Sequence, residues 1–120
     1  GRPGRFQTEA AIQSVHAQRA CTGADLDDVL LGLYELLEQQ APSAGARVGR
    51  ALVQGRVHGP SAGLALLELG DDLCSFQPAW VARAHLLEAS GDRSGARAAR
   101  ARALTEDPAV SAFLRSADVP

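Results

Sequence analysis

The residue types that most often carry catalysis or bind metals are few in this sequence and widely spaced. Three histidines, His16, His58 and His85, and two cysteines, Cys21 and Cys74, stand far apart and fit no ligand spacing of a zinc or other metal site. We therefore expect the three histidine side chains to lie at the surface or to be partly packed. We expect the two cysteines to be buried, unpaired thiols in a reduced cytosol.

Neighbouring carboxylates occur at Asp27-Asp28 and at Asp71-Asp72. Adjacent residues on a helix point in different directions, so such a pair is poorly arranged to act as acid and base on one substrate. We interpret the first pair as helix-capping residues and the second as solvated loop residues. The sequence also lacks a phosphate-binding loop, a dinucleotide fingerprint and a nucleophile elbow. We therefore expect no catalytic residue, no metal and no cofactor, and a small helical enzyme is the least favoured function.

Arginines recur at helical spacing at Arg93, Arg97 and Arg100 and form one cationic stripe. The stripe predicts either a solvated outer face or an electrostatic contact with an acidic partner or nucleic acid. Arg100 stands where a repeat unit normally has a large apolar residue, so its methylene groups are expected to pack while the guanidinium reaches water.

Composition favours one all-α domain. The chain has 120 residues, of which 46% are hydrophobic and only 4% aromatic, so a core of mainly Ala, Leu and Val is expected. Its formal net charge of −2 is unlike the basic surface of nucleic-acid-binding domains, so we expect no direct nucleic-acid binding. With no membrane-spanning run and no signal peptide, we expect a soluble, cytoplasmic protein. The absence of Met fits either a removed initiator or a fragment of a longer polypeptide.

Helical periodicity continues from Phe6 to Arg115, broken at intervals by Gly, Pro and Asp. It predicts about seven helices, with N-caps at Asp25 or Asp27 and at Ser43. The expected segments are Phe6–Ala20, Asp25 or Asp27 to Gln40, Ser43–His58, Pro60 to Leu69, a loop over Gly70–Gln77, Pro78–Ala89, Asp92 to Thr105, and a last short helix opened by Asp107 and Pro108 that carries Val110, Phe113 and Leu114.

Small residues recur about every 33 residues, which is typical of a helical repeat. Numbering the segment that ends at Pro108 as a tetratricopeptide unit places suitable types at the consensus positions of Trp80, Ala84, Leu87, Gly91, Ala96, Ala103 and Pro108. Equivalent positions in the two preceding units hold Ala51, Gly63 and Leu67, and then Tyr34 and Pro42. Because small residues let paired helices approach closely, we expect residues 1–120 to form one short right-handed array of antiparallel, tetratricopeptide-repeat-like helices.

In such an array the first helix of each pair lines the concave side. The residues expected to bind a partner there, as a helix or an extended peptide, are Val15, Arg19, Val48, Leu52, Val81, His85 and Glu88, with Thr22 and Gly55 at the remaining positions. The alternative is that these are ordinary packing and surface positions.

A set of short strings, taken in order, matches a known family. They are Arg5-Phe6-Gln7, Glu9-Ala10-Ala11-Ile12, Val15-His16-Ala17, Leu33-Tyr34-Glu35, Pro42-Ser43, Arg50-Ala51, His58-Gly59-Pro60, Ala62-Gly63-Leu64, Arg83-Ala84-His85-Leu86-Leu87, Arg102-Ala103-Leu104, Pro108-Ala109 and Ala112-Phe113-Leu114. From Arg5 to Arg115 the chain thereby resembles the tetratricopeptide-like C-terminal extension of a group of extracytoplasmic-function RNA polymerase sigma factors. It departs from that pattern at Leu26-Asp27-Asp28, where the family usually has Trp, and at Gly49, where it usually has Asn.

The resemblance implies a regulatory, non-enzymatic appendage of a transcription initiation factor, whose promoter-reading and core-binding regions lie upstream. Its partners would be proteins: the sigma regions, RNA polymerase or a regulatory protein. A free-standing tetratricopeptide-like adaptor is the alternative that the sequence leaves open.

Overall fold

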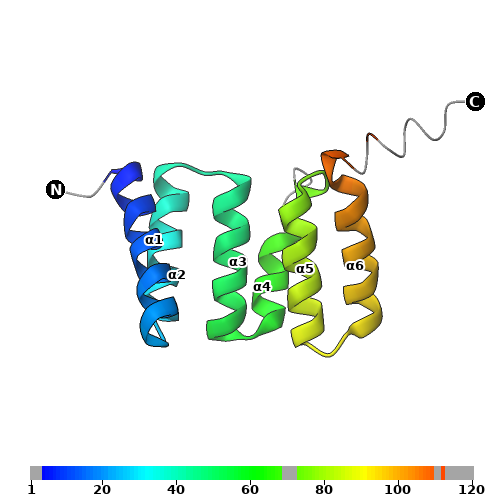
Figure 1. The fold of residues 1–120 in the computed structure, drawn as a ribbon, viewed down its shortest axis with the longest axis horizontal. Helices are drawn as coiled ribbons and strands as arrows, with labels where there is room; N and C mark the ends of the chain where they lie inside the picture. The colour runs from blue at the N-terminus through cyan, green and yellow to red at the C-terminus, as the bar shows by residue number, and fades with distance from the viewer. Residues whose placement is uncertain (1–3, 69–72, 110–111, 113–120) are drawn as a thin grey trace, which may run out of the picture.

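The computed structural model describes residues 4–68, 73–109 and 112, and over these residues the chain is all-helical, with six helices and no strand. The helices are α1 (Arg5–Thr22), α2 (Asp27–Gln40), α3 (Ala44–His58), α4 (Pro60–Leu67), α5 (Gln77–Ala89) and α6 (Arg93–Glu106). They lie side by side in a row, and the chain runs up and down along it (Figure 1). Val110, Phe113 and Leu114 of the expected seventh helix lie outside the described residues, as do Leu69 and loop residues 70–72. None of the helices that the structure describes combines the length and the apolar composition needed to cross a membrane.

Most helix ends follow the signals in the sequence. Ser43 caps α3, because its Oγ accepts a hydrogen bond from the backbone N of Ala46 at 3.1 Å. In the same way, Asp92 caps α6 by accepting from the backbone N of Gly95 at 2.9 Å. Gly59 alone separates α3 from α4, and its φ of +102° is a conformation that only glycine adopts readily. Pro60 then follows in the first turn of α4, where its missing N–H costs nothing.

The start of α2 differs from the prediction. The N-cap residue is Leu26 and not Asp25 or Asp27, and no side chain caps the helix. Asp25 instead accepts a hydrogen bond at 3.2 Å from the backbone N of Asp27, and so closes a local turn just before the helix. Asp27 and Asp28 lie in the first turn of α2, where negative charge is favourable beside the helix N-terminus.

Two clusters of buried side chains lie on opposite faces of α3. The cluster between α1, α2 and α3 contains Ile12, Leu30, Leu31, Leu37, Ala46 and Val53. The cluster between α3, α4 and α5 contains Val48, Ala51, Leu67, Leu73, Ala79, Ala82 and Leu86. Because α3 contributes to both, it joins the two halves of the row. α6 packs on α5 and buries Ala96, Ala99 and Ala103.

The small residues of the repeat pattern lie where helices approach closely. Ala51 and Ala84 are 0% and 3% exposed. Gly63 of α4 faces α3 so closely that a Cβ there would overlap the carbonyl O of Ala51. Leu86 of α5 fills the space above Gly55 and Gly63, since a Cβ on Gly55 would overlap a Leu86 methyl group. The absence of side chains at these glycines thus lets α3, α4 and α5 pack together.

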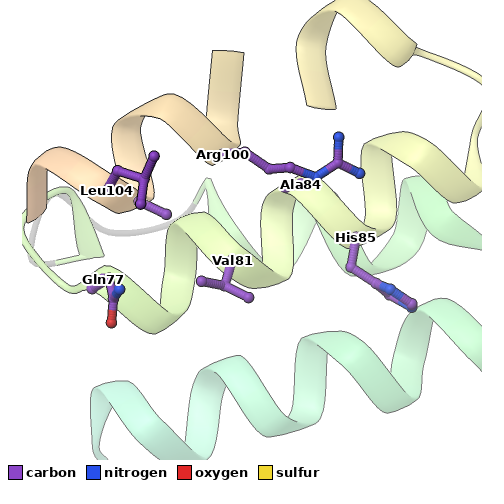
Figure 2. A pocket seen from close by; sticks show the side chains of 7 residues that line it. Gln77, Val81, Ala84, His85, Arg100 and Leu104 are labelled. Carbon is purple, nitrogen blue, oxygen red and sulfur yellow. The ribbon is translucent and has the colours of Figure 1, made fainter. Parts of the chain in front are cut away.

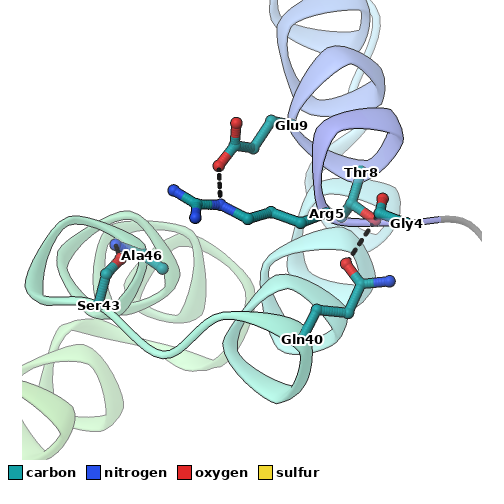
Figure 3. Close-up of polar contacts among 7 residues, drawn as sticks. All are labelled: Gly4, Arg5, Thr8, Glu9, Gln40, Ser43 and Ala46. Atoms are coloured by element: carbon teal, nitrogen blue, oxygen red, sulfur yellow. Dashed lines mark hydrogen bonds and ion pairs between the residues drawn. The ribbon is translucent and has the colours of Figure 1, made fainter.

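A buried polar contact ties the first two helices together. Thr8 of α1 is 1% exposed, and its hydroxyl lies 2.8 Å from Oε1 of Gln40 at the end of α2 (Figure 3). A buried hydroxyl is costly unless it is hydrogen-bonded, so this contact fixes how the start of α1 meets the end of α2. On the exposed side of the same turn, Arg5 pairs with Glu9 at 3.0 Å.

Candidate partner-binding site

One face of α5 borders two hollows. Gln77, Val81 and His85 follow one another at four-residue spacing, so their side chains lie on the same face of the helix. They border both a hollow of about 490 Å³ between α5 and α6 and a hollow of about 550 Å³ between α3 and α5. We call the two hollows together the α5 groove.

The other residues of the α5 groove come from three helices. The hollow between α5 and α6 is completed by Ala84, Arg100, Ala103 and Leu104. The hollow between α3 and α5 is completed by Leu52, Arg56, Pro78 and Ala82. Figure 2 shows the first of these hollows, with Gln77, Val81 and His85 on α5 and with Arg100 and Leu104 on α6.

The α5 groove holds exposed apolar side chains. Val81 is 53% exposed and Leu104 is 62% exposed. Of the large hydrophobic side chains exposed on the described part of the chain, the other two, Phe6 and Val29, lie on α1 and α2. An apolar surface of this kind, next to charged groups, is typical of a site that another molecule covers.

The charged groups that line the groove are cationic. They are the guanidinium groups of Arg56 and Arg100, and no carboxylate is among the described residues that line the groove. Two carboxylates pair with the arginines from outside the lining: Asp27 Oδ1 lies 3.0 Å from Arg56 Nε, and Glu88 Oε2 lies 3.3 Å from Arg100 Nη2. A guanidinium carries five N–H donors, so each pair leaves donors of the arginine to meet a partner.

Tyr34 lies next to the Arg56 side of the site. Burial raises the pKa of the Tyr34 hydroxyl above its usual value of 10.0, and the positive charge of Arg56 offsets part of this rise. Nε2 of His16 lies 3.3 Å from the hydroxyl. The Tyr34 ring packs directly on Gly49, where a Cβ would overlap it. Gly49 is one of the two positions at which the chain departs from the pattern that it resembles, and here its small size makes room for Tyr34.

The structure brings together three of the residues expected to bind a partner. Leu52, Val81 and His85 all border the hollow between α3 and α5. Glu88 is exposed one turn further along α5, and it contacts the groove through its ion pair with Arg100.

The remaining expected residues lie elsewhere. Val48 is 7% exposed and packs in the cluster between α3, α4 and α5, so its placement on an accessible surface is wrong. The reason is that α3 is covered on two faces and Val48 points into one of them. Val15 and Arg19 are partly buried on α1, with Val15 packed beside the cluster between α1, α2 and α3. Neither of them borders the α5 groove.

Sequence reasoning missed several residues that line the groove. Gln77 and Arg56 were not expected there, nor was Leu104. Each of them lies four residues from a residue that was singled out: Gln77 from Val81, Arg56 from Leu52, and Leu104 from Arg100. Extending each candidate by one helical turn along its own face would have found all three.

The cysteines are exposed, so the prediction of two buried thiols is wrong. Cys21 lies in the last turn of α1, beyond the buried Thr8 and Ile12, and Cys74 precedes α5. Trp80 lies away from the groove: its indole N–H donates to the carbonyl O of Cys74 at 2.8 Å. Within the described part of the chain, no group of three or more His, Cys, Asp or Glu side chains is placed to hold a metal ion.

The three arginines of the cationic stripe have different surroundings. Arg93 and Arg97 are exposed on α6. Arg100 is also exposed, but it turns toward α5, where it pairs with Glu88 and borders the groove. Of the three, Arg100 is therefore the one that can contact a molecule bound in the α5 groove.

The chain is similar to a known protein over almost its whole length. The chain is 35% identical over 118 residues to a protein of Rhizobium meliloti (strain 1021) that is described as uncharacterized. The matched region covers 95% of this chain, and the chain spans about 28% of the length of that relative. No model of a known protein family matches the chain. No solved structure matches it either.

Proposed function

We propose that this chain is a regulatory protein-binding domain of an extracytoplasmic-function sigma factor, built as a right-handed, tetratricopeptide-like array of helices. It modulates transcription initiation by contacting another protein, and the α5 groove is its contact surface. The observation that carries the binding role is the exposure of Val81 and Leu104 beside Arg100 in one groove.

The spacing of buried small residues supports the repeat arrangement. Ala51 and Ala84 are separated by 84 − 51 = 33 residues, and both are buried. Gly63 and Ala96 are separated by 96 − 63 = 33 residues, and both are buried as well. Each pair consists of equivalent positions in consecutive units of the proposed repeat. The packing of α3 against α5, the first helices of those units, agrees with this register.

The chemistry of the groove supports binding. Its lining combines aliphatic side chains with guanidinium groups and one imidazole. Exposed apolar side chains release ordered water when they are covered, and arginines at the edge orient a partner through charge. The place of this domain within a sigma factor rests on the resemblance from Arg5 to Arg115. The much greater length of the Rhizobium relative is compatible with a domain attached to further regions.

The proposal is tested by deleting this segment from the longer protein that contains it and measuring promoter-dependent transcription with purified RNA polymerase. We expect initiation to be impaired while the remainder of the protein stays folded. Full promoter-dependent activity of the deletion variant would contradict the regulatory role. The coding sequence upstream of Gly1 separates the sigma factor from the free-standing adaptor, because only the former has sigma-type helices there.

A further inference from the structure

We propose that the α5 groove binds an amphipathic helix of a partner protein, one whose apolar stripe is flanked by Asp or Glu residues. This inference rests on the proposed function, since it takes the α5 groove as the contact surface, and it adds the chemical class of the partner.

The apolar part of the partner follows from the groove floor. Leu52, Val81 and Leu104 come from α3, α5 and α6 in turn, so aliphatic side chains cross the groove from one hollow to the other. Val81 borders both hollows and is 53% exposed. A partner that covers Val81 must present apolar side chains, because a polar group placed there would lose its hydration without gaining a hydrogen bond.

The acidic part of the partner follows from the charges at the edges. Arg100 lies on the α6 side of the groove and Arg56 on the α3 side. The described lining holds no carboxylate, although the whole chain has a net charge of −2. Asp27 and Glu88 offset the charge of Arg56 and Arg100, but each guanidinium keeps N–H donors beyond its ion pair, and carboxylates on either side of an apolar stripe complement these donors.

The helical form of the partner follows from the length of the groove and from the fold. Gln77 and His85 mark its extent along α5, and the 85 − 77 = 8 helical rises of about 1.5 Å between them give roughly 12 Å. An extended peptide would place only about four residues over this length, with alternate side chains facing the groove. A helix would place about eight, and its residues i, i+3 or i+4, and i+7 would face the groove together. The described residues also contain no strand, so they offer no sheet edge to which an extended peptide could add itself.

The experiment is a selection of random peptides displayed on phage against the immobilised full chain. Peptides of about sixteen residues are long enough for four helical turns. Selected peptides are then synthesised, and their dissociation constants are measured by fluorescence anisotropy at low and at high salt. We expect selected sequences to be acidic, to carry apolar residues at helical spacing, and to bind more weakly as salt rises.

Two matched pairs of variants test whether such peptides bind in the groove. Val81→Asp should weaken binding by at least about tenfold, because it places a charge at the centre of the apolar floor. Val29→Asp, at a site of similar exposure (50%) on α2, should change it less than about twofold. Arg100→Gln should weaken binding about threefold to tenfold, whereas Arg97→Gln, at an exposed position on the same helix, should have little effect. Circular dichroism checks that each variant is folded. If Val81→Asp is misfolded, His85→Glu is tested in its place, because His85 is exposed.

Several results would overturn the inference. These are an absence of selected peptides, selected peptides without acidic residues, or binding that is insensitive to Val81→Asp and His85→Glu. Self-association of the chain that Val81→Asp abolishes would assign the groove to a second copy. Peptide binding that is seen only after Phe113→Ser would assign the groove to the chain's own last residues. The proposed function fails separately, when the deletion variant keeps full transcriptional activity.

Discussion

Replacing Gly63 by alanine tests the close packing of α3 and α4. Gly63 is buried in α4, and a Cβ there would overlap the carbonyl O of Ala51 on α3. The same Cβ would lie 3.1 Å from Cδ1 of Leu86 and 3.2 Å from Cα of Gly55. Because two of these three obstructing atoms belong to the backbone, no side-chain rotation removes the overlap. The two helices must move apart.

The magnitude follows from two opposing effects. Overpacking a close contact costs about 1–3 kcal/mol, and a backbone obstruction favours the upper part of that range. Alanine regains about 1 kcal/mol because its helix propensity exceeds that of glycine. We therefore predict that Gly63→Ala lowers the free energy of unfolding by about 1–2 kcal/mol.

Gly32→Ala is the matched control. Gly32 lies in α2, is exposed, and has no atom within 4 Å of the place where a Cβ would stand. The same change there gains helix propensity without any overlap, so it should raise the free energy of unfolding by about 0.5–1 kcal/mol.

The assay is urea unfolding of both variants and the unchanged chain, followed by far-ultraviolet circular dichroism. The two substitutions should move the midpoint in opposite directions without changing the slope of the transition. A Gly63→Ala variant as stable as Gly32→Ala, or more stable, would refute the claim that this glycine is required for α3 and α4 to pack.

Three further predictions concern the packing, the ionisation and the capping of the helices. Ala84→Trp should collapse the packing of α5 on α6, because Ala84 is 3% exposed and overpacking costs about 1–3 kcal/mol or more; unchanged thermal stability would mean that the repeat register is wrong. Tyr34, the chain's only tyrosine, has a raised pKa in the folded chain, so the free energy of unfolding should be unaffected by its titration below about pH 10 and should fall as pH rises through the folded pKa. Tyr34→Phe should remove this fall. The absorbance of tyrosinate in the folded chain should rise only above about pH 10. Ser43→Ala should cost about 1 kcal/mol through loss of the α3 cap, whereas Ser61→Ala at an exposed position should be nearly neutral in urea unfolding.

Local signals in the sequence were sufficient for the all-helical class and for most of the helix ends. Ser43 and Pro60 are placed at helix starts by the chemistry of single side chains and of the nearby backbone, so they can be identified without knowing the tertiary structure. The start of α2 was misassigned because Asp25 and Asp27 are both suitable caps by type. Which of them bonds the backbone depends on the exact path of the preceding turn.

Tertiary packing explains the errors in the core. The repeat numbering placed Leu87 at a consensus position of the fifth helix, but the buried leucine of that helix is Leu86. Periodicity alone cannot distinguish Leu86 from Leu87, since both are leucines one position apart. The choice is made by the space above Gly55 and Gly63, which lie on other helices.

The candidate site shows the same limit. Leu52, Val81 and His85 were predicted from the repeat numbering, which carries information about tertiary arrangement. Arg56 was missed because the repeat numbering selects Leu52 and Gly55 but not Arg56, which lies one helical turn beyond Leu52 on the same face.

The central proposal is that the α5 groove contacts another protein and that this contact modulates transcription initiation. It is tested most directly by promoter-dependent transcription with the proposed sigma factor carrying Val81→Asp, compared with the same protein carrying Val29→Asp. Loss of a central contact typically costs about 2 kcal/mol or more, so we predict that Val81→Asp lowers initiation at limiting protein concentration by about tenfold or more, while Val29→Asp leaves it unchanged. Equal activity of the two folded variants would contradict the account.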